Sequence, residues 1–255
     1  MKKFALAGKP IAHSKSPDLF RTAYPNSDFK YLLIETTDLK YIEKLLRNKT
    51  LAGVNLTVPL KIEALQIVDE IDETAEMIGA ANTIMMQANN KLKAWNTDYL
   101  GVLKTLQELK IDIKNQNCLI IGAGGAARAA TFTLNMLEAN ITIANRTLDK
   151  AKQIAERKNC SLIFFDEINE NILDKKLIIN TISADICMLD EAKLQPQQII
   201  FDAKVEQSVL LQKAQKYCRC IDGRMWLLHQ GIAAYKLFTQ KQPDIDGMRK
   251  ILNIN

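Results

Sequence analysis

The chain has 255 residues, of which 47% are hydrophobic and 25% are charged, and its formal net charge is +5. This composition is that of a globular protein with enough length for one large domain or two smaller ones. The mild positive charge argues against the dense basic surface that binds nucleic acid. Five cysteines without a CxxC pair, and only two histidines, predict no metal site and a reduced, cytoplasmic protein.

Predicted strands and helices alternate along the first hundred residues. We expect strands at 3–8, 29–36 and 52–58, helices at 17–25, 38–48 and 59–71, and two strands within 82–98 around the turn at 88–91. Pro59 stands at the first turn of the helix predicted at 59–71, where its missing N–H costs nothing. This alternation predicts an α/β layer with a mainly parallel sheet. The first ten residues lack the apolar run of a signal peptide, and no segment is long enough to span a bilayer.

A second alternating run follows an amphipathic helix predicted at 99–111. We expect a strand from 117, a glycine turn and a helix, a strand at 141–146, a helix at 148–158, strands at 161–166, 176–182 and 198–203, and helices at 225–240 and 244–253. The chain is therefore predicted to form a first domain at 1–98, a second at 99–222, and C-terminal helices at 223–255 that could cover either domain.

The glycine turn directly follows an apolar strand and opens a helix. It consists of Gly122, Ala123, Gly124, Gly125 and Ala126. Glycines at such a turn let the backbone approach a pyrophosphate, whose charge then lies against the free N–H groups of the helix start. A tight turn without a ligand is the alternative, but strand, turn, helix and second strand in this order favour a dinucleotide site.

The residues after the second strand of this run indicate the coenzyme. They include Asn145, Arg146, Thr147 and Lys150. An NAD site usually has a carboxylate at this place, whereas an arginine suits the 2′-phosphate of NADP. No acidic residue precedes Arg146 in the strand, so two cations would meet that phosphate without repulsion. The sequence predicts NADP, with a solvated loop as the alternative.

Polar side chains also gather where the strands of the first domain begin or end. They are Ser14 and Ser16, then Asn55, Thr57 and Lys61, then Asn82 and Asp98. Taken singly, each has a structural explanation, such as helix capping or a surface lysine in the first turn of a helix. Together they mark the edge at which open α/β sheets bind ligands. Beside an NADP site, the expected chemistry is hydride transfer at a carbon bearing oxygen. A lysine with a neighbouring carboxylate could take or return the hydroxyl proton in that reaction.

Several short motifs make the chain resemble the shikimate dehydrogenase family over nearly its whole length. They are SKSP at 14–17, NLTVPLK at 55–61, GAANT at 79–83, NTD at 96–98, GAGGAARA at 122–129, NRT at 145–147, NTIS at 180–183 and the Gln230-Gly231 pair. The resemblance implies NADP-dependent reduction of 3-dehydroshikimate to shikimate, on the route to aromatic amino acids. It also implies two α/β domains, the second Rossmann-like, with a cleft between them and the C-terminal helices returning to the first.

The resemblance further implies a role for each matched residue. Lys61 would be the acid–base group, and Asp98 would be its partner and hold a substrate hydroxyl. The substrate carboxylate would meet Ser14 and Ser16, and the ring hydroxyls would meet Asn55, Thr57, Asn82 and Gln230. Residues 122–126 would hold the pyrophosphate, residues 145–150 the 2′-phosphate, and Gly223 would lie near the nicotinamide.

The chain departs from the family pattern at three places. The stretch 202–211 lacks the family's tyrosine, Trp226 replaces a methionine near the nicotinamide, and Arg224 is unusual. Two alternatives therefore stay open, a relative acting on quinate or a similar hydroxy acid, and an NADP-binding sensor with weakened catalysis. The expected partner is a small anionic substrate, and we expect no binding to nucleic acid or membrane. The expected oligomeric state is a monomer or a homodimer.

Overall fold

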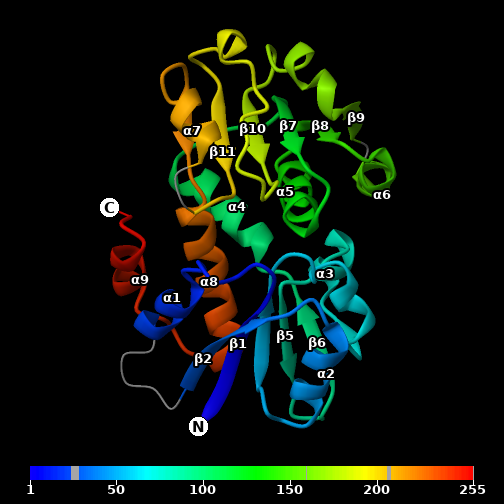
Figure 1. Cartoon of the computed structure of the whole chain (residues 1–255), viewed down its shortest axis with the longest axis vertical. Helices are drawn as coiled ribbons and strands as arrows, with labels where there is room; N and C mark the ends of the chain where they lie inside the picture. The colour runs from blue at the N-terminus through cyan, green and yellow to red at the C-terminus, as the bar shows by residue number, and fades with distance from the viewer. Residues whose placement is uncertain (24–28, 159, 206–207, 255) are drawn as a thin grey trace. The chain divides into compact units, whose positions relative to one another are not determined.

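The chain forms two compact units, drawn in Figure 1. The computed structural model describes residues 1–23, 29–158, 160–205 and 208–254. Unit 1 comprises Met1–Gly101 and Leu227–Asn255, and unit 2 comprises Val102–Trp226. The units divide at 101/102 and 226/227, where the sequence places domain limits at 98/99 and 222/223. Two helices contribute residues to both units, namely α4 (Asp98–Glu108) and α8 (Arg224–Thr239).

Unit 1 contains a six-stranded sheet in the order β2-β1-β3-β5-β6-β4. Its strands are β1 (Lys2–Gly8), β2 (Phe29–Glu35), β3 (Gly53–Leu56), β4 (Glu70–Ile71), β5 (Thr83–Met86) and β6 (Leu92–Trp95). Strand β1 pairs in parallel with β2 and β3, and β4 pairs in parallel with β6, whereas β5 is antiparallel to both of its neighbours. The expected mainly parallel sheet is therefore mixed, because the predicted hairpin around 88–91 supplies antiparallel strands.

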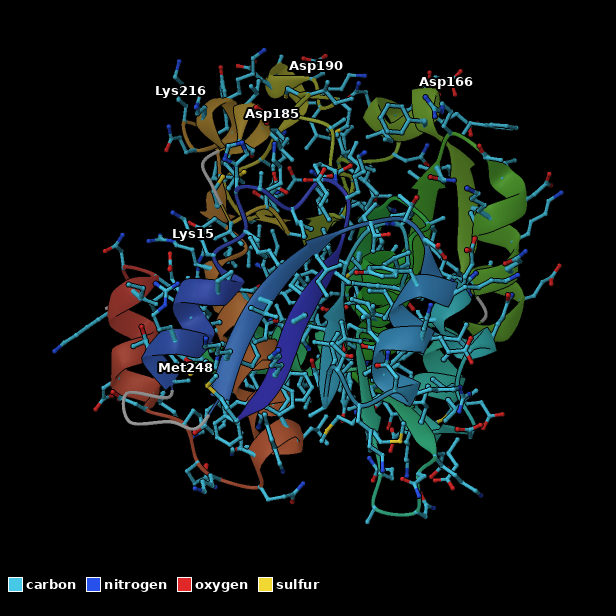
Figure 2. All side chains as sticks on the ribbon, turned by 60° about the horizontal axis from the view of Figure 1, so that its bottom comes forward. Lys15, Asp166, Asp185, Asp190, Lys216 and Met248 are labelled. Carbon is cyan, nitrogen blue, oxygen red and sulfur yellow. The ribbon has the colours of Figure 1, made fainter. Side chains whose placement is uncertain are left out.

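Helices cover both faces of this sheet. They are α1 (Ser16–Ala23), α2 (Leu39–Arg47), α3 (Glu73–Ile78), α9 (Ile245–Ile251) and the unit 1 part of α8. The last two residues of the helix expected at 17–25 lie outside the described residues. One core cluster joins β1, α1, α8 and α9, with Phe4 stacked on Phe238 at 4.4 Å between ring centroids. Met248 of α9, labelled in Figure 2, is fully buried and belongs to that cluster.

The helix predicted at 59–71 does not form. Residues 58–62 make turns, and a short 3₁₀ helix, η1, covers Glu63–Gln66. The backbone N–H groups of Asp69 and Asp72 donate to carbonyls of residues 92 and 94, and Glu70–Ile71 pairs with β6. Asp72 then caps α3, accepting from the Thr74 N–H. Sheet pairing thus takes the hydrogen bonds that a continuous helix would have used, so Lys61 lies in a turn and not in a first helical turn.

Unit 2 contains a fully parallel sheet in the order β12-β11-β10-β7-β8-β9. Its strands are β7 (Asn117–Ile121), β8 (Asn140–Asn145), β9 (Ser161–Phe164), β10 (Leu177–Asn180), β11 (Ile199–Asp202) and β12 (Arg219–Ile221). The central strands are short apolar runs, buried because helices and loops cover both faces of the sheet. The first strand of this unit, β7, lies in the middle of the sheet, with β8 and β9 on one side and β10, β11 and β12 on the other. This is the strand order of a doubly wound sheet.

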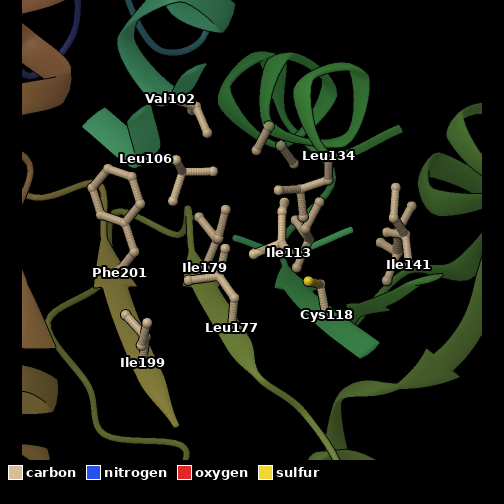
Figure 3. Packing of buried hydrophobic residues seen from close by; sticks show 14 of the residues in the cluster. Val102, Leu106, Ile113, Cys118, Leu134, Ile141, Leu177, Ile179, Ile199 and Phe201 are labelled. Atoms are coloured by element: carbon tan, nitrogen blue, oxygen red, sulfur yellow. The ribbon is translucent and has the colours of Figure 1, made fainter. Parts of the chain in front are cut away.

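The connections of unit 2 pack over this sheet. They include α5 (Gly125–Met136), α6 (Leu148–Lys158), η2 (Phe165–Glu170), η3 (Glu191–Lys193) and α7 (Val209–Ala214). Figure 3 shows one face of the core, where Val102 and Leu106 of α4 and Phe201 of β11 belong to one buried cluster. Charged side chains such as Asp166, Asp190 and Lys216 project from the surface of the same unit in Figure 2.

The fold class predicted from the sequence is confirmed: a two-domain α/β protein whose second domain is Rossmann-like and whose C-terminal helices pack on the first. Helix α7 and strand β12 were not predicted, because these elements, of six and three residues, are too short to show a clear hydrophobic periodicity. Across the described part of the chain, no helix combines the length and the apolar character required to span a bilayer.

Candidate active site and coenzyme site

Lys61 and Asp98 form a close ion pair within unit 1. Lys61 Nζ lies 2.6 Å from Asp98 Oδ2, and the two side chains are only 15% and 6% exposed. Residues 37 positions apart in sequence thus meet in a partly buried position. A charge-assisted hydrogen bond of this length fixes the direction in which the amine points.

The backbone around each partner holds the pair in place. The Lys61 carbonyl accepts from the Ala81 N–H at 2.8 Å, which ties the turn after β3 to the start of β5. Asp98 is the first residue of α4, and its N–H donates to Asn96 Oδ1 at 2.9 Å. Asn96 Nδ2 in turn donates to the Ala80 carbonyl. Both turns are therefore anchored to the same short segment, Ala80–Ala81.

A polar cluster around Asn82 lies in the same unit. Asn82 Oδ1 accepts from the Thr97 N–H at 2.8 Å, and Asn82 Nδ2 donates to Thr97 Oγ1 at 2.9 Å and to Gln230 Oε1 at 3.3 Å. The other end of the Gln230 amide donates to the Leu227 carbonyl. Gln230 of α8 and Asn82 are therefore in direct contact although they are 148 positions apart. Thr97, the middle residue of the NTD motif at 96–98, contacts both of these amides.

Asn55 uses its side chain within the protein. Its Nδ2 donates to Thr83 Oγ1 at 2.9 Å and to the Asn82 carbonyl at 3.3 Å, and its Oδ1 accepts from the Tyr31 hydroxyl at 2.8 Å. Both amide hydrogens are thereby occupied, and one lone pair of Oδ1 remains. Neither Tyr31 nor Thr83 was predicted as a site residue.

The remaining predicted substrate residues lie at the ends of β1 and β3. Ser14 Oγ accepts from the Ser16 N–H at 3.2 Å, which leaves the Ser14 hydroxyl hydrogen available to a ligand. Ser16 is the first residue of α1 and is buried. The N–H of Thr57, directly after β3, donates to the Ala7 carbonyl. A Cβ added at Gly8 would overlap the Thr57 methyl group, so this glycine gives the threonine its room.

Two of the three glycines in the glycine turn of unit 2 have different structural environments. Gly122 has φ +114°, and an added Cβ would overlap the Thr181 hydroxyl, so the fold itself requires glycine there. Gly124 has an ordinary φ of −82°, and an added Cβ would meet nothing within 4 Å. It is the N-cap of α5 and provides no side-chain acceptor, so the first N–H groups of the helix stay available to an anion. The space next to the Gly124 Cα, at the start of α5, is therefore open.

The residues predicted to read the 2′-phosphate lie between β8 and α6. Asn145 Nδ2 donates to the Thr147 carbonyl at 2.7 Å and so shapes the turn. Arg146 and Lys150 are exposed, and among the described residues neither has an ion-pair partner within 4 Å. Asp149 lies between them in sequence, but its side chain is 88% exposed and faces Lys152 at 3.8 Å. The turn therefore offers two uncommitted cations to a phosphate.

The segments that depart from the family pattern have clear structural roles in unit 2. Trp226 is buried in the core cluster and packs against Phe201 at 5.6 Å between ring centroids. Arg224 Nε donates to both carboxylate oxygens of Asp222 at 3.0 and 2.9 Å. An added Cβ at Gly223 would overlap the Ala203 carbonyl. Within the stretch 202–211, residues 206 and 207 lie outside the described residues.

A buried carboxylate stands at the start of that stretch. Asp202 accepts from the Ser208 hydroxyl at 2.6 Å, from Asn180 Nδ2 at 3.1 Å and from the Lys204 N–H at 3.1 Å. Burial raises the pKa of this carboxyl above its ordinary value, although the hydrogen bond from Ser208 opposes the shift. Asp202 therefore anchors the loop that follows β11.

Together the fold and the two sites define a dinucleotide-dependent dehydrogenase, with a doubly wound sheet and glycine turn in one unit and a lysine–carboxylate pair in the other. Comparison with known proteins agrees. Residues 6–84 match the shikimate dehydrogenase substrate binding domain, and residues 104–211 match the shikimate / quinate 5-dehydrogenase family. The NADP(+) shikimate dehydrogenase of Methanococcoides burtonii is 37% identical over 264 residues, which cover 98% of this chain and 97% of the relative.

Solved structures show the same likeness. A shikimate dehydrogenase in complex with NADP+ has 32% sequence identity and a TM-score of 0.87, over 99% of this chain and 95% of that chain. The Thermus thermophilus enzyme, in complex with NADP(H) and shikimate, has 29% identity and a TM-score of 0.86, over 99% of each chain. The chain belongs to the shikimate dehydrogenase family. The enzyme class and coenzyme predicted from the sequence, an oxidoreductase that uses NADP, are confirmed.

Proposed function

We propose that this protein interconverts 3-dehydroshikimate and shikimate, with Lys61 and Asp98 as its acid–base pair. The observation that carries the proposal is the 2.6 Å contact between Lys61 Nζ and Asp98 Oδ2, at the ends of strands where other polar side chains also gather. NADP, when bound, exchanges the hydride. In reduction Lys61 Nζ gives a proton to the oxygen that becomes the hydroxyl, and in oxidation it takes that proton back.

The other polar groups of unit 1 would orient the substrate. The hydroxyls of Ser14 and Ser16, at the start of α1, suit a carboxylate. Thr57, Asn82 and Gln230 suit the ring hydroxyls, and the second oxygen of Asp98 can accept from one of them. Asn55 has one acceptor pair left for a ligand. This set offers donors to a carboxylate and mixed partners to hydroxyls, as a small anionic hydroxy acid requires.

Unit 2 would hold the coenzyme. The turn 122–126 would receive the pyrophosphate over Gly124, and Arg146 and Lys150 would receive the 2′-phosphate, with Asn145 and Thr147 shaping their loop. We also place Gly223 among the coenzyme residues, near the nicotinamide, as its family position implies. The expected oligomeric state, a monomer or a homodimer, remains a prediction.

An absorbance assay at the NADPH band tests the proposed function. Shikimate and quinate are each offered with NADP and with NAD. We expect turnover with shikimate and NADP, and much weaker turnover in the other three combinations. A clear preference for quinate would move the substrate assignment to the related hydroxy acid. The absence of any turnover, with NADP binding intact, would favour the coenzyme-sensor alternative.

A further inference from the structure

A chain of hydrogen bonds runs across one face of the unit 1 sheet. Tyr31 Oη donates to Asn55 Oδ1 at 2.8 Å, and Asn55 Nδ2 donates to Thr83 Oγ1 at 2.9 Å. Thr83 Oγ1 donates to Asn82 Oδ1 at 3.1 Å, and Asn82 Nδ2 donates to Gln230 Oε1 at 3.3 Å. Every link therefore donates in the same sense, from the edge strand β2 toward helix α8.

The chain begins among aromatic residues at Tyr31 and ends in the polar cluster around Asn82. Tyr31 belongs to β2 and Asn55 to β3, and β1 lies between these strands, so the tyrosine side chain reaches over β1. Asn55 and Thr83 are directly opposed residues of β3 and β5. The Tyr31 ring stacks on Phe20 at 4.2 Å with an interplanar angle of 11°, within the cluster that contains Phe4. The Tyr31 ring therefore packs among aromatic side chains, whereas Asn55 also donates to the Asn82 carbonyl and Asn82 is also bonded to Thr97.

Such a chain contributes more to orientation than to stability. Apolar residues of the same shape could replace a satisfied buried polar pair with little change in stability. They would not, however, fix the orientation of the amide that follows in the chain of hydrogen bonds. Hydrogen bonds in series also polarise one another where the local dielectric is low. The Asn55 amide cannot rotate without losing its bonds to both Tyr31 and Thr83. The hydrogen bond from the Thr83 hydroxyl therefore acts on the Asn82 amide together with the bonds that Asn82 makes with Thr97.

We propose that Tyr31 and Thr83 are positioning residues for the substrate, acting through Asn55 on the amides of Asn82 and Gln230. The inference rests on the proposed function, in which those two amides bind the ring hydroxyls. Neither positioning residue touches the substrate in this account. Their task is to present Asn82 and Gln230 with the correct donor and acceptor orientation before the substrate arrives.

Two substitutions remove single hydroxyls from the chain. Tyr31→Phe keeps the ring that stacks on Phe20, and Thr83→Val keeps the side-chain shape. We expect each to weaken shikimate binding roughly 3- to 10-fold, about the effect of one neutral hydrogen bond. The effect should be present in the dissociation constant of shikimate without coenzyme and in its KM, while kcat and NADP affinity stay close to wild type. Thr83→Ser, which retains the hydroxyl, should restore wild-type affinity.

A double variant and a matched control separate positioning from general loosening. If the chain acts as a unit, Tyr31→Phe with Thr83→Val should weaken shikimate binding no more than the more harmful single change. Tyr235→Phe removes a buried tyrosine hydroxyl from the same core cluster, outside the chain. It should lower thermal stability without altering shikimate affinity.

The outcomes divide clearly. Wild-type shikimate binding that persists unchanged in Tyr31→Phe and Thr83→Val would overturn the positioning role and leave the proposed function intact. Effects that multiply in the double variant, or that Tyr235→Phe reproduces, would also overturn it. Failure of the wild-type protein to bind shikimate would overturn the proposed function, and the inference with it.

Discussion

Two of the three glycines of the coenzyme turn give a sharp prediction, because the fold requires Gly122, whereas no protein atom prevents a side chain at Gly124. In Gly124→Ala the new methyl group meets no protein atom within 4 Å, and φ −82° is ordinary for alanine. Loss of a favourable N-cap residue costs roughly 0.5–1 kcal/mol, and the stiffer unfolded chain offsets about 0.4–1 kcal/mol. We therefore expect the melting temperature to change by only about 2–4 °C at most.

The matched variant Gly122→Ala should behave differently. At φ +114° an alanine is strained, and its Cβ would overlap the Thr181 hydroxyl. Strain of this kind costs roughly 1–3 kcal/mol, which corresponds to a fall in melting temperature of about 2–12 °C for a chain of this size. The overlap adds to that cost, so Gly122→Ala should lose both stability and NADP binding.

Coenzyme affinity is the measurement that separates the two glycines. In Gly124→Ala the methyl group would occupy the space assigned to the diphosphate, so the NADPH dissociation constant, followed by fluorescence titration, should rise at least 10-fold, about 1.4 kcal/mol. Shikimate binding by unit 1 serves as the internal control and should not change. A Gly124→Ala protein that melts and binds NADPH like wild type would refute the placement of the pyrophosphate over this residue.

Three further predictions concern charged groups. Lys61→Ala should lower kcat roughly 10²- to 10⁴-fold with near-normal NADP affinity. The control Lys175→Ala, which removes another partly buried lysine ion pair, should leave kcat close to wild type. Near-normal turnover in Lys61→Ala would remove this lysine from the mechanism. Arg146→Ala should weaken NADP binding roughly 10- to 100-fold, as expected for lost charge-assisted hydrogen bonds, and equal loss for NAD in parallel titrations would show that it does not read the 2′-phosphate. The raised pKa of Asp202 means that the native state keeps a proton which the unfolded state releases. The contribution of this group to stability is therefore greatest below the ordinary carboxyl pKa and declines as pH rises through the raised one. Asp202→Asn should flatten this decline in melting temperature at pH values above the ordinary carboxyl pKa of about 4, and an unchanged slope would contradict the assignment.

The sequence predicted those parts of the protein that short-range patterns determine. The strand, glycine turn and helix at 117–136 follow from local periodicity and from the conformational needs of glycine. The pairing of Lys61 with Asp98 was expected only through the family resemblance, since nothing local relates two side chains 37 positions apart.

Other parts were decided by tertiary contacts that the sequence does not display. Residues 59–71 have a helix-like pattern, yet β6 supplies hydrogen-bond partners to Asp69 and Asp72, and the helix is lost. Tyr31 resembles any aromatic residue of a strand, and its bond to Asn55 depends on the order in which β2, β1 and β3 assemble. A single sequence carries no signal for such a contact, because it arises from topology.

The division of the chain between the units also sets an order for folding during synthesis. Unit 2 is continuous in sequence, so all of its strands have left the ribosome soon after Trp226 is made. The core of unit 1 cannot be completed until its last segment has been synthesised, because Phe238 and Met248 cover Phe4 and Phe20. A nascent chain that pauses before residue 227 therefore exposes an aromatic surface made at the very beginning of translation, and this surface is where a chaperone would be needed.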